Sequence, residues 1–250
     1  MKNQKLLNRK CFAFTFAEVL ITLGVIGVVA AMTLPTLIKN YQKTVWVNQL
    51  KKSMSVISQG LQKAMADEGV TSLTHLSNRI FGNRACGNEK NVLKYFQLAK
   101  IKGYGDYCHE HDDGSLYPGL YFDRVFGNVD DKYFDGDGYY LQDGTLFGIE
   151  PYSPALSCTD NTRIWGRLWL DVNGDKRGPN KIGRDFFYFY VTDTGNLLPI
   201  YSKSLNCTNQ DDWLDIADVN WKNNDTCSVE KGKYYGCAAR IIENGWKMDY

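Results

Sequence analysis

Apolar residues are concentrated in one continuous segment near the beginning of the chain. Phe14–Leu34 comprises 21 residues and carries a single charge, Glu18. A helix of this length rises about 31 Å at roughly 1.5 Å per residue, which is close to the thickness of the hydrocarbon core of a bilayer. The segment therefore predicts one membrane-spanning helix.

The pattern then changes to one that is apolar on a single side. Between residues 39 and 68, apolar side chains recur at intervals of three or four, and lysines and glutamines occupy the other faces. The apolar positions are Trp46, Leu50, Met54, Ile57, Leu61 and Met65. We expect the membrane helix of residues 14–35 to continue as an amphipathic helix over residues 36–69, with a kink at Pro35 and a stop at Gly69. The apolar side needs a folded domain to cover it.

Shorter patterns follow in residues 70–250, which we expect to form a globular α+β domain. Asp143-Gly144 between two apolar runs predicts a hairpin with a two-residue turn. Other β-prone runs predict further strands, and a short helix is expected over residues 88–100. The strand runs are residues 139–149, 164–172, 186–191, 197–200 and, near the end, Cys237–Glu243. Because no helical crossovers separate the central runs, we expect an antiparallel sheet on which the long helix packs.

The distribution of charge predicts the orientation of the membrane helix. The chain has 29 basic and 28 acidic residues, a net charge of +1, so we expect no nucleic-acid partner. Residues 1–13 contain no acid, and their basic residues are Lys2, Lys5, Arg9 and Lys10. A basic flank stays on the cytoplasmic side of a membrane, which places the globular domain outside the cytoplasm.

The number and position of the cysteines are consistent with export of the globular domain. Six of the seven follow the apolar segment: Cys86, Cys108, Cys158, Cys207, Cys227 and Cys237. An even number in an exported domain predicts disulfide bonds that staple the C-terminal region, although the sequence leaves the pairing open. A set of buried free thiols is the alternative.

The junction between the basic leader and the apolar segment carries a recognisable string, Ala13-Phe14-Thr15-Phe16-Ala17-Glu18. It resembles the prepilin-type processing site of type IV pilins and type II secretion pseudopilins. In that family a small residue, usually Gly, precedes a methylated Phe, and a Glu stands fifth after the cut. Pro35, 22 residues after Ala13, also matches a family position.

The resemblance implies both a processing pathway and a function. A prepilin peptidase and methyltransferase would remove residues 1–13, cutting between Ala13 and Phe14, and Glu18 and Pro35 would serve assembly. The mature chain would be a non-enzymatic structural subunit held in the inner membrane, with its N-terminus cytoplasmic and its domain periplasmic. It would then join a homo- or hetero-oligomeric type IV pilus or type II secretion pseudopilus, in the first case at the cell surface.

Several alternatives stay open. A minor pilin would act at the filament tip as an adhesin or in DNA uptake, which would make a ligand or nucleic acid its partner. An enzymatic domain on a membrane anchor is a more distant alternative, because the sequence holds no GxSxG, HExxH or phosphate-loop motif. A plain anchor and a signal peptide cut after Val29-Ala30-Ala31 are the remaining ones.

One loop has the residue types of a cation site. Asp171, Asn173 and Asp175 alternate, and Asp185 follows at the end of the same connection. Such oxygens suit calcium, and the stretch looks like loops in prepilin-type proteins, some of which bind calcium. It is not an EF-hand, because Ile182 stands at the twelfth position where that motif requires Glu. The alternative is a turn stabilised by Asx and Gly residues.

Overall fold

The computed structural model describes most of the long helix and the central sheet. The described residues are 15–76, 92–96, 98, 108–110, 116–118, 120–121, 137–158, 160–174, 177–201, 226–227 and 235–250. The chain divides into two compact units, Met1–Gln42 and Lys43–Tyr250. The leader, Ala13, Phe14, Cys86, Asp175 and Cys207 lie outside the described residues, so the predictions made for them stay predictions.

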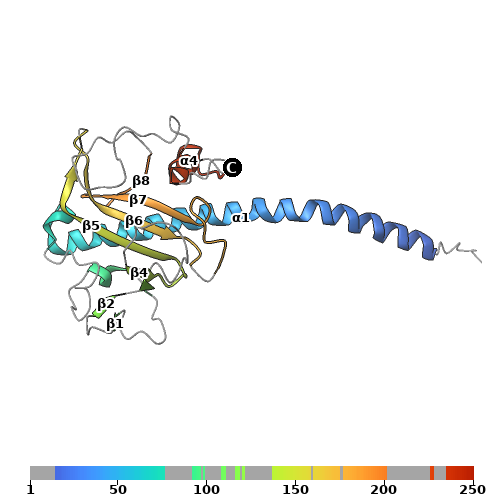
Figure 1. Cartoon of the computed structure of the whole chain (residues 1–250), viewed down its shortest axis with the longest axis horizontal. Helices are drawn as coiled ribbons and strands as arrows, with labels where there is room; N and C mark the ends of the chain where they lie inside the picture. Colours follow the sequence, from blue (N-terminus) through green and yellow to red (C-terminus); the bar gives the residue numbers. More distant parts are fainter. Residues whose placement is uncertain are drawn as a thin grey trace, which may run out of the picture. The chain divides into compact units, whose positions relative to one another are not determined.

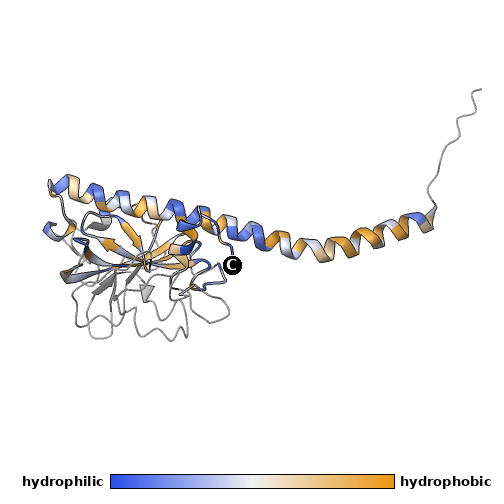
Figure 2. Cartoon of the chain, turned by 90° about the horizontal axis from the view of Figure 1, so that it is seen from above, coloured by the Kyte–Doolittle hydropathy of each residue, from blue (hydrophilic) through white to orange (hydrophobic). Residues whose placement is uncertain are grey.

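Helix α1 (Phe16–Glu68) contains segments of both units and continues through Pro35 without a break (Figure 1). Its first part is coloured as predominantly hydrophobic in Figure 2. This part is also exposed, with Phe16 at 79% and Met32 at 75% exposure. This part is long and apolar enough to cross a membrane, and none of its most apolar stretch is buried. A signal sequence would meet the same criteria of length and composition.

The end of α1 follows the sequence prediction. Gly69 has a φ of 66°, a left-handed conformation that favours glycine. Its N–H donates to the Ala66 carbonyl, and the Val70 N–H donates to the Met65 carbonyl. These two bonds form a Schellman motif, which satisfies carbonyls that the last helical turn leaves unpaired.

Six strands form an antiparallel meander in the second unit. They are β3 (Leu120–Tyr121), β4 (Asp137–Tyr140), β5 (Leu146–Ser157), β6 (Arg163–Asp171), β7 (Phe186–Thr192) and β8 (Leu197–Pro199), in that spatial order. A separate pair consists of β1 (Cys108–Glu110) and β2 (Leu116–Pro118). The predicted antiparallel sheet is confirmed, and neighbouring strands are also consecutive in sequence.

The β4–β5 hairpin differs from the prediction in its turn. The Gly144 N–H donates to the Leu141 carbonyl, and the Leu141 N–H donates to the Thr145 carbonyl. Gly144 follows the turn with a φ of 90°. This is the pattern of a three-residue loop that ends in a left-handed residue, so the expected two-residue turn is wrong although the hairpin is confirmed.

The residues of α1 in the second unit pack on one face of the sheet. Leu50, Ile57 and Leu61 are fully buried and share a core cluster with Phe147 and Leu168. Polar bonds fix the register of the helix on two connections. Ser53 and Thr145 hydroxyls lie 3.1 Å apart, and Ser58 Oγ donates to the Gly195 carbonyl at 2.8 Å. The expected α+β layout, a long N-terminal helix packed on an antiparallel sheet, is therefore confirmed.

The other face of the sheet is also apolar and buried. On β7, Phe187 and Phe189 belong to the cluster beside α1, whereas Phe186 and Tyr188 belong to a second cluster with Trp169. The Phe186 ring lies 5.9 Å from Trp169 and 5.0 Å from Tyr188 between centroids. Because both faces are covered, β7 has no alternation of apolar and polar residues, as in its sequence FFYFYVT.

The structure corrects one predicted strand to a helix and describes only part of one predicted helix. Cys237–Glu243 is helix α4, so the expected final strand is wrong. Ala238 and Ala239 favour helix, and Gly245 with a φ of 70° ends it, with N–H bonds from Gly245 to Ile242 and from Trp246 to Ile241. The helix expected over residues 88–100 appears in the described part only as the 3-10 turn η2 (Val92–Tyr95); a second such turn, η1, spans Leu73–His75.

Candidate functional site

The first turn of α1 carries the Thr15–Glu18 pair that follows the expected processing point. The Thr15 backbone N–H and its hydroxyl each donate to Glu18 Oε2 at 2.8 Å. In return, Thr15 Oγ1 accepts a bond from the Glu18 N–H at 3.2 Å. This reciprocal pair is a capping box, in which a Thr before the helix and a Glu three residues later satisfy donors that the helix start leaves unpaired.

The capping box gives Glu18 a partner within its own chain. Sequence reasoning assigned Glu18 to assembly and missed this bond, although Thr-x-x-Glu before an apolar run is its sequence signature. The assembly role of Glu18 stays a prediction. Pro35, the other residue that the resemblance assigns to assembly, lies exposed inside α1.

The β6–β7 connection brings three of the four expected calcium ligands into one bonded loop. Asp171 and Asp185 are both fully buried, one at the end of β6 and the other just before β7. Asp171 Oδ1 accepts bonds from the Asn173 and Gly174 N–H groups at 3.1 and 2.9 Å. The Val172 N–H donates to the Asp185 carbonyl at 2.8 Å and ties the two ends of the loop together.

Asp185 organises the second half of the same loop. Its Oδ1 accepts from the Lys181 N–H at 2.8 Å, and its Oδ2 accepts from the Asn180 N–H at 2.9 Å. Burial raises the pKa of the Asp185 carboxyl above its usual value, whereas these N–H groups and the Asn173 side chain favour the ionised form. These bonds match the Asx-stabilised turn that the sequence offered as the alternative to calcium.

The donors of the loop are hard oxygens, which fit the chemistry of calcium. Within the part of the chain that the structure describes, however, no three acidic, His or Cys residues gather closely enough to hold a metal ion. Asp175, the remaining expected ligand, lies outside that part. Calcium binding by Asp171, Asn173, Asp175 and Asp185 therefore stays a prediction.

Chelation tests this prediction. If calcium binds the folded loop, replacing calcium by a chelator lowers the melting temperature, because a ligand that binds only the folded state stabilises it. Asp175→Ala should abolish the difference between the two melting curves. Asp160→Ala is the matched control, since Asp160 caps the separate turn at Thr162 and should leave the response intact. Identical curves for the wild type with calcium and with chelator would contradict calcium binding.

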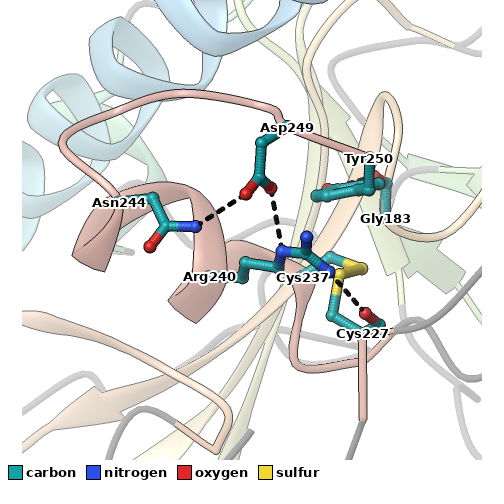
Figure 3. Close-up of a disulfide and its surroundings, with 7 residues drawn as sticks. All are labelled: Gly183, Cys227, Cys237, Arg240, Asn244, Asp249 and Tyr250. Carbon is teal, nitrogen blue, oxygen red and sulfur yellow. Dashed lines mark hydrogen bonds and ion pairs between the residues drawn. A yellow bond between two sulfur atoms is a disulfide. The ribbon is translucent and has the colours of Figure 1, made fainter. Parts of the chain in front are cut away.

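A third cluster surrounds the disulfide between Cys227 and Cys237, whose sulfur atoms are 2.08 Å apart (Figure 3). Cys158 is also disulfide-bonded. The expectation of disulfides is thus confirmed for these three cysteines. Cys86 and Cys207 lie outside the described residues, as does the side chain of Cys108.

Arg240 of α4 lies at the centre of this cluster. Its Nη1 donates to the Cys227 carbonyl at 3.1 Å, and its Nε donates to Asp249 Oδ1 at 2.8 Å. The guanidinium carbon lies 5.1 Å from the centre of the Tyr250 ring, a cation–π contact. Asn244 Nδ2 holds the other carboxylate oxygen of Asp249 at 3.1 Å. Sequence reasoning missed this cluster, because nothing in the local pattern pairs Arg240 with residues 227 and 249.

Comparison with known proteins finds no matching family model, no matching curated protein and no matching solved structure. The geometry of the chain itself therefore carries the functional argument.

Proposed function

We propose that this chain is a structural subunit, a pilin or pseudopilin, of a type IV pilus or a type II secretion system. A prepilin peptidase removes residues 1–13, and the inner membrane stores the mature subunit until it is assembled through α1. The globular domain then lies in the periplasm, and the filament is its destination. The subunit acts by packing and needs no catalytic group.

The observation that carries this proposal is the combination of two properties in one helix. The first part of α1 is exposed and apolar on all sides, and it is long and apolar enough to cross a membrane. The second part is covered on one side by the sheet. A helix that is apolar all round needs lipid or other helices as surroundings, and a filament core supplies the latter.

The position of the only charge in the apolar segment supports the same proposal. Glu18 lies in the first turn of α1, bonded to Thr15, immediately after the string that resembles a prepilin site. A plain anchor has no need of a carboxylate in its apolar segment, where a charge is costly. In a processed subunit, the new amine of Phe14 would give the Glu18 carboxylate a nearby positive charge.

Processing is the direct test of the proposal. In cells that contain a prepilin peptidase, we expect mass spectrometry to find a mature N-terminus at Phe14, with the amine methylated. In cells lacking the peptidase, the chain should keep its leader. An N-terminus at Met32 would instead identify a signal peptide cut after Ala31, and a chain that keeps its leader in both strains would identify a plain anchor.

A further inference from the structure

The β6–β7 connection is held from outside by a residue far away in the sequence. The Tyr250 hydroxyl donates to the Gly183 carbonyl at 2.6 Å (Figure 3). Tyr250 is partly buried against the core cluster. This burial raises the pKa of its hydroxyl above the ordinary value. The hydroxyl therefore stays protonated, and remains a donor, over the pH range in which proteins are normally folded.

Residues 244–250, which we call the strap, are themselves fixed by α4. The strap begins at the Schellman motif that ends α4, and Asp249 returns to bind Arg240 and Asn244. Tyr250 follows Asp249 directly, so this ion pair determines where its ring lies. The ring then contacts the Arg240 guanidinium on one side and reaches Gly183 with its hydroxyl.

The disulfide holds the other end of the same helix. Cys237 is the first residue of α4, and its bond to Cys227 places the Cys227 carbonyl where Arg240 Nη1 can donate to it. The Gly236 N–H also donates to the Thr226 carbonyl at 3.1 Å. Arg240 thus contacts both the disulfide-linked segment and the strap, and α4 packs against β7, the strand that the loop precedes.

We infer that the strap is an oxidation-dependent lock on the β6–β7 connection. The Cys227–Cys237 disulfide and Arg240 hold the strap, and the Tyr250–Gly183 bond holds the loop that carries Asp185. Formation of the disulfide from two thiols releases two protons and transfers two electrons to an external disulfide, which is reduced to a dithiol. The loop is consequently fixed only after the domain has reached an oxidising compartment. This inference does not depend on the filament proposal.

Hydrogen–deuterium exchange of the full chain in detergent tests the lock. The loop peptides cover residues 177–186, and peptides from β5 and β6 are the internal reference. Tyr250→Phe keeps the ring and its contact with Arg240 but removes the donor to Gly183. We expect loop amides to exchange about fivefold faster in this variant, the scale of one lost hydrogen bond, with the reference peptides unchanged. An unchanged loop would overturn the role of the strap.

Two further variants test the dependence on oxidation. Cys227→Ser/Cys237→Ser should accelerate loop exchange at least as much as Tyr250→Phe does. If the loop exchanges at the wild-type rate in this double variant, the disulfide does not control the lock and that part of the inference is wrong. If exchange in the reference peptides is also faster, the double variant has unfolded the domain. The Arg240→Lys variant then tests whether the disulfide acts on the strap. Arg240→Lys keeps a positive charge beside Asp249 but loses the second donor, the one to the Cys227 carbonyl. Loop exchange at the wild-type rate in this variant would overturn the link between the disulfide and the strap.

Discussion

A subunit carrying Glu18→Ala is expected to insert into the membrane normally and to enter filaments poorly. In the proposed pathway, cleavage after Ala13 would create an amine at Phe14, and in a staggered filament the amine of an incoming subunit would meet Glu18 of its neighbour. Removing one partner of an ion pair that is withdrawn from water leaves the other charge uncompensated. We therefore expect incorporation to fall by at least about tenfold relative to the wild type.

The capping box provides a second explanation that the experiment must separate from the first. Glu18→Ala removes both the charge and the bond to the Thr15 N–H. Glu18→Gln removes the charge but keeps a side chain that can complete the box, since Gln serves at this position as well as Glu. If the charge directs docking, Gln should be as defective as Ala. If the carboxylate only orders the first turn, Gln should be close to the wild type.

The measurement is a competition inside one cell. Each variant is expressed beside the wild-type subunit, and the ratio of the two is determined in membranes and in purified filaments. Carbonate extraction of the membranes confirms insertion, and the mature mass confirms processing. Wild-type incorporation of a fully processed Glu18→Ala subunit would show that Glu18 is not a docking group.

Phe147→Ala is expected to have the largest effect on the stability of the globular domain. Phe147 is fully buried on β5, and its ring centre lies 5.4 Å from that of Phe96 and 5.9 Å from that of Tyr139. Truncation to Ala removes this packing and leaves a cavity beneath α1. The free energy of unfolding should fall by about 3–5 kcal/mol, the usual cost of truncating a buried aromatic residue.

Guanidinium titration of the full chain in detergent measures this loss, with tryptophan fluorescence, to which Trp165 and Trp169 of β6 contribute, as the probe. Phe147→Leu is the matched control, because it keeps the site apolar and most of its volume. We expect this conservative change to cost clearly less than Ala, in the range below about 2 kcal/mol. A loss of under 1 kcal/mol for Phe147→Ala would show that the helix and sheet do not form one cooperative core.

The elements with strong local patterns were predictable from sequence. The spacing of Leu50, Ile57 and Leu61 gave a helix with one covered side, and Gly69 marked its end. The hydrophobic runs in β5, β6 and β7 gave strands. The continuous aromatic run of β7 is the pattern of a strand that is covered on both faces. The pattern does not show which segments pack against each side of the sheet.

Other features could not be predicted because they join residues that are distant in sequence. The pairing of Cys227 with Cys237 required the structure, since six cysteines allow many pairings. The contacts of Arg240 and Tyr250 depend on how α4 and the strap return to the sheet. By contrast, the α4 helix was missed despite local signals, because Ala238-Ala239 and Gly245 favour a helix and its stop over a strand.

The short strands at the two edges of the described sheet limit how neighbouring copies of the chain can contact one another. β8 spans only Leu197–Pro199, and β3 at the opposite side spans Leu120–Tyr121. Pro199 has no N–H to offer a further strand, and so short an edge gives little template for backbone pairing between molecules. Copies packed side by side in the proposed filament would therefore not fuse their sheets into aggregates. Helices and loops would make the contacts between copies, and their side chains can distinguish the correct neighbour from a wrong one.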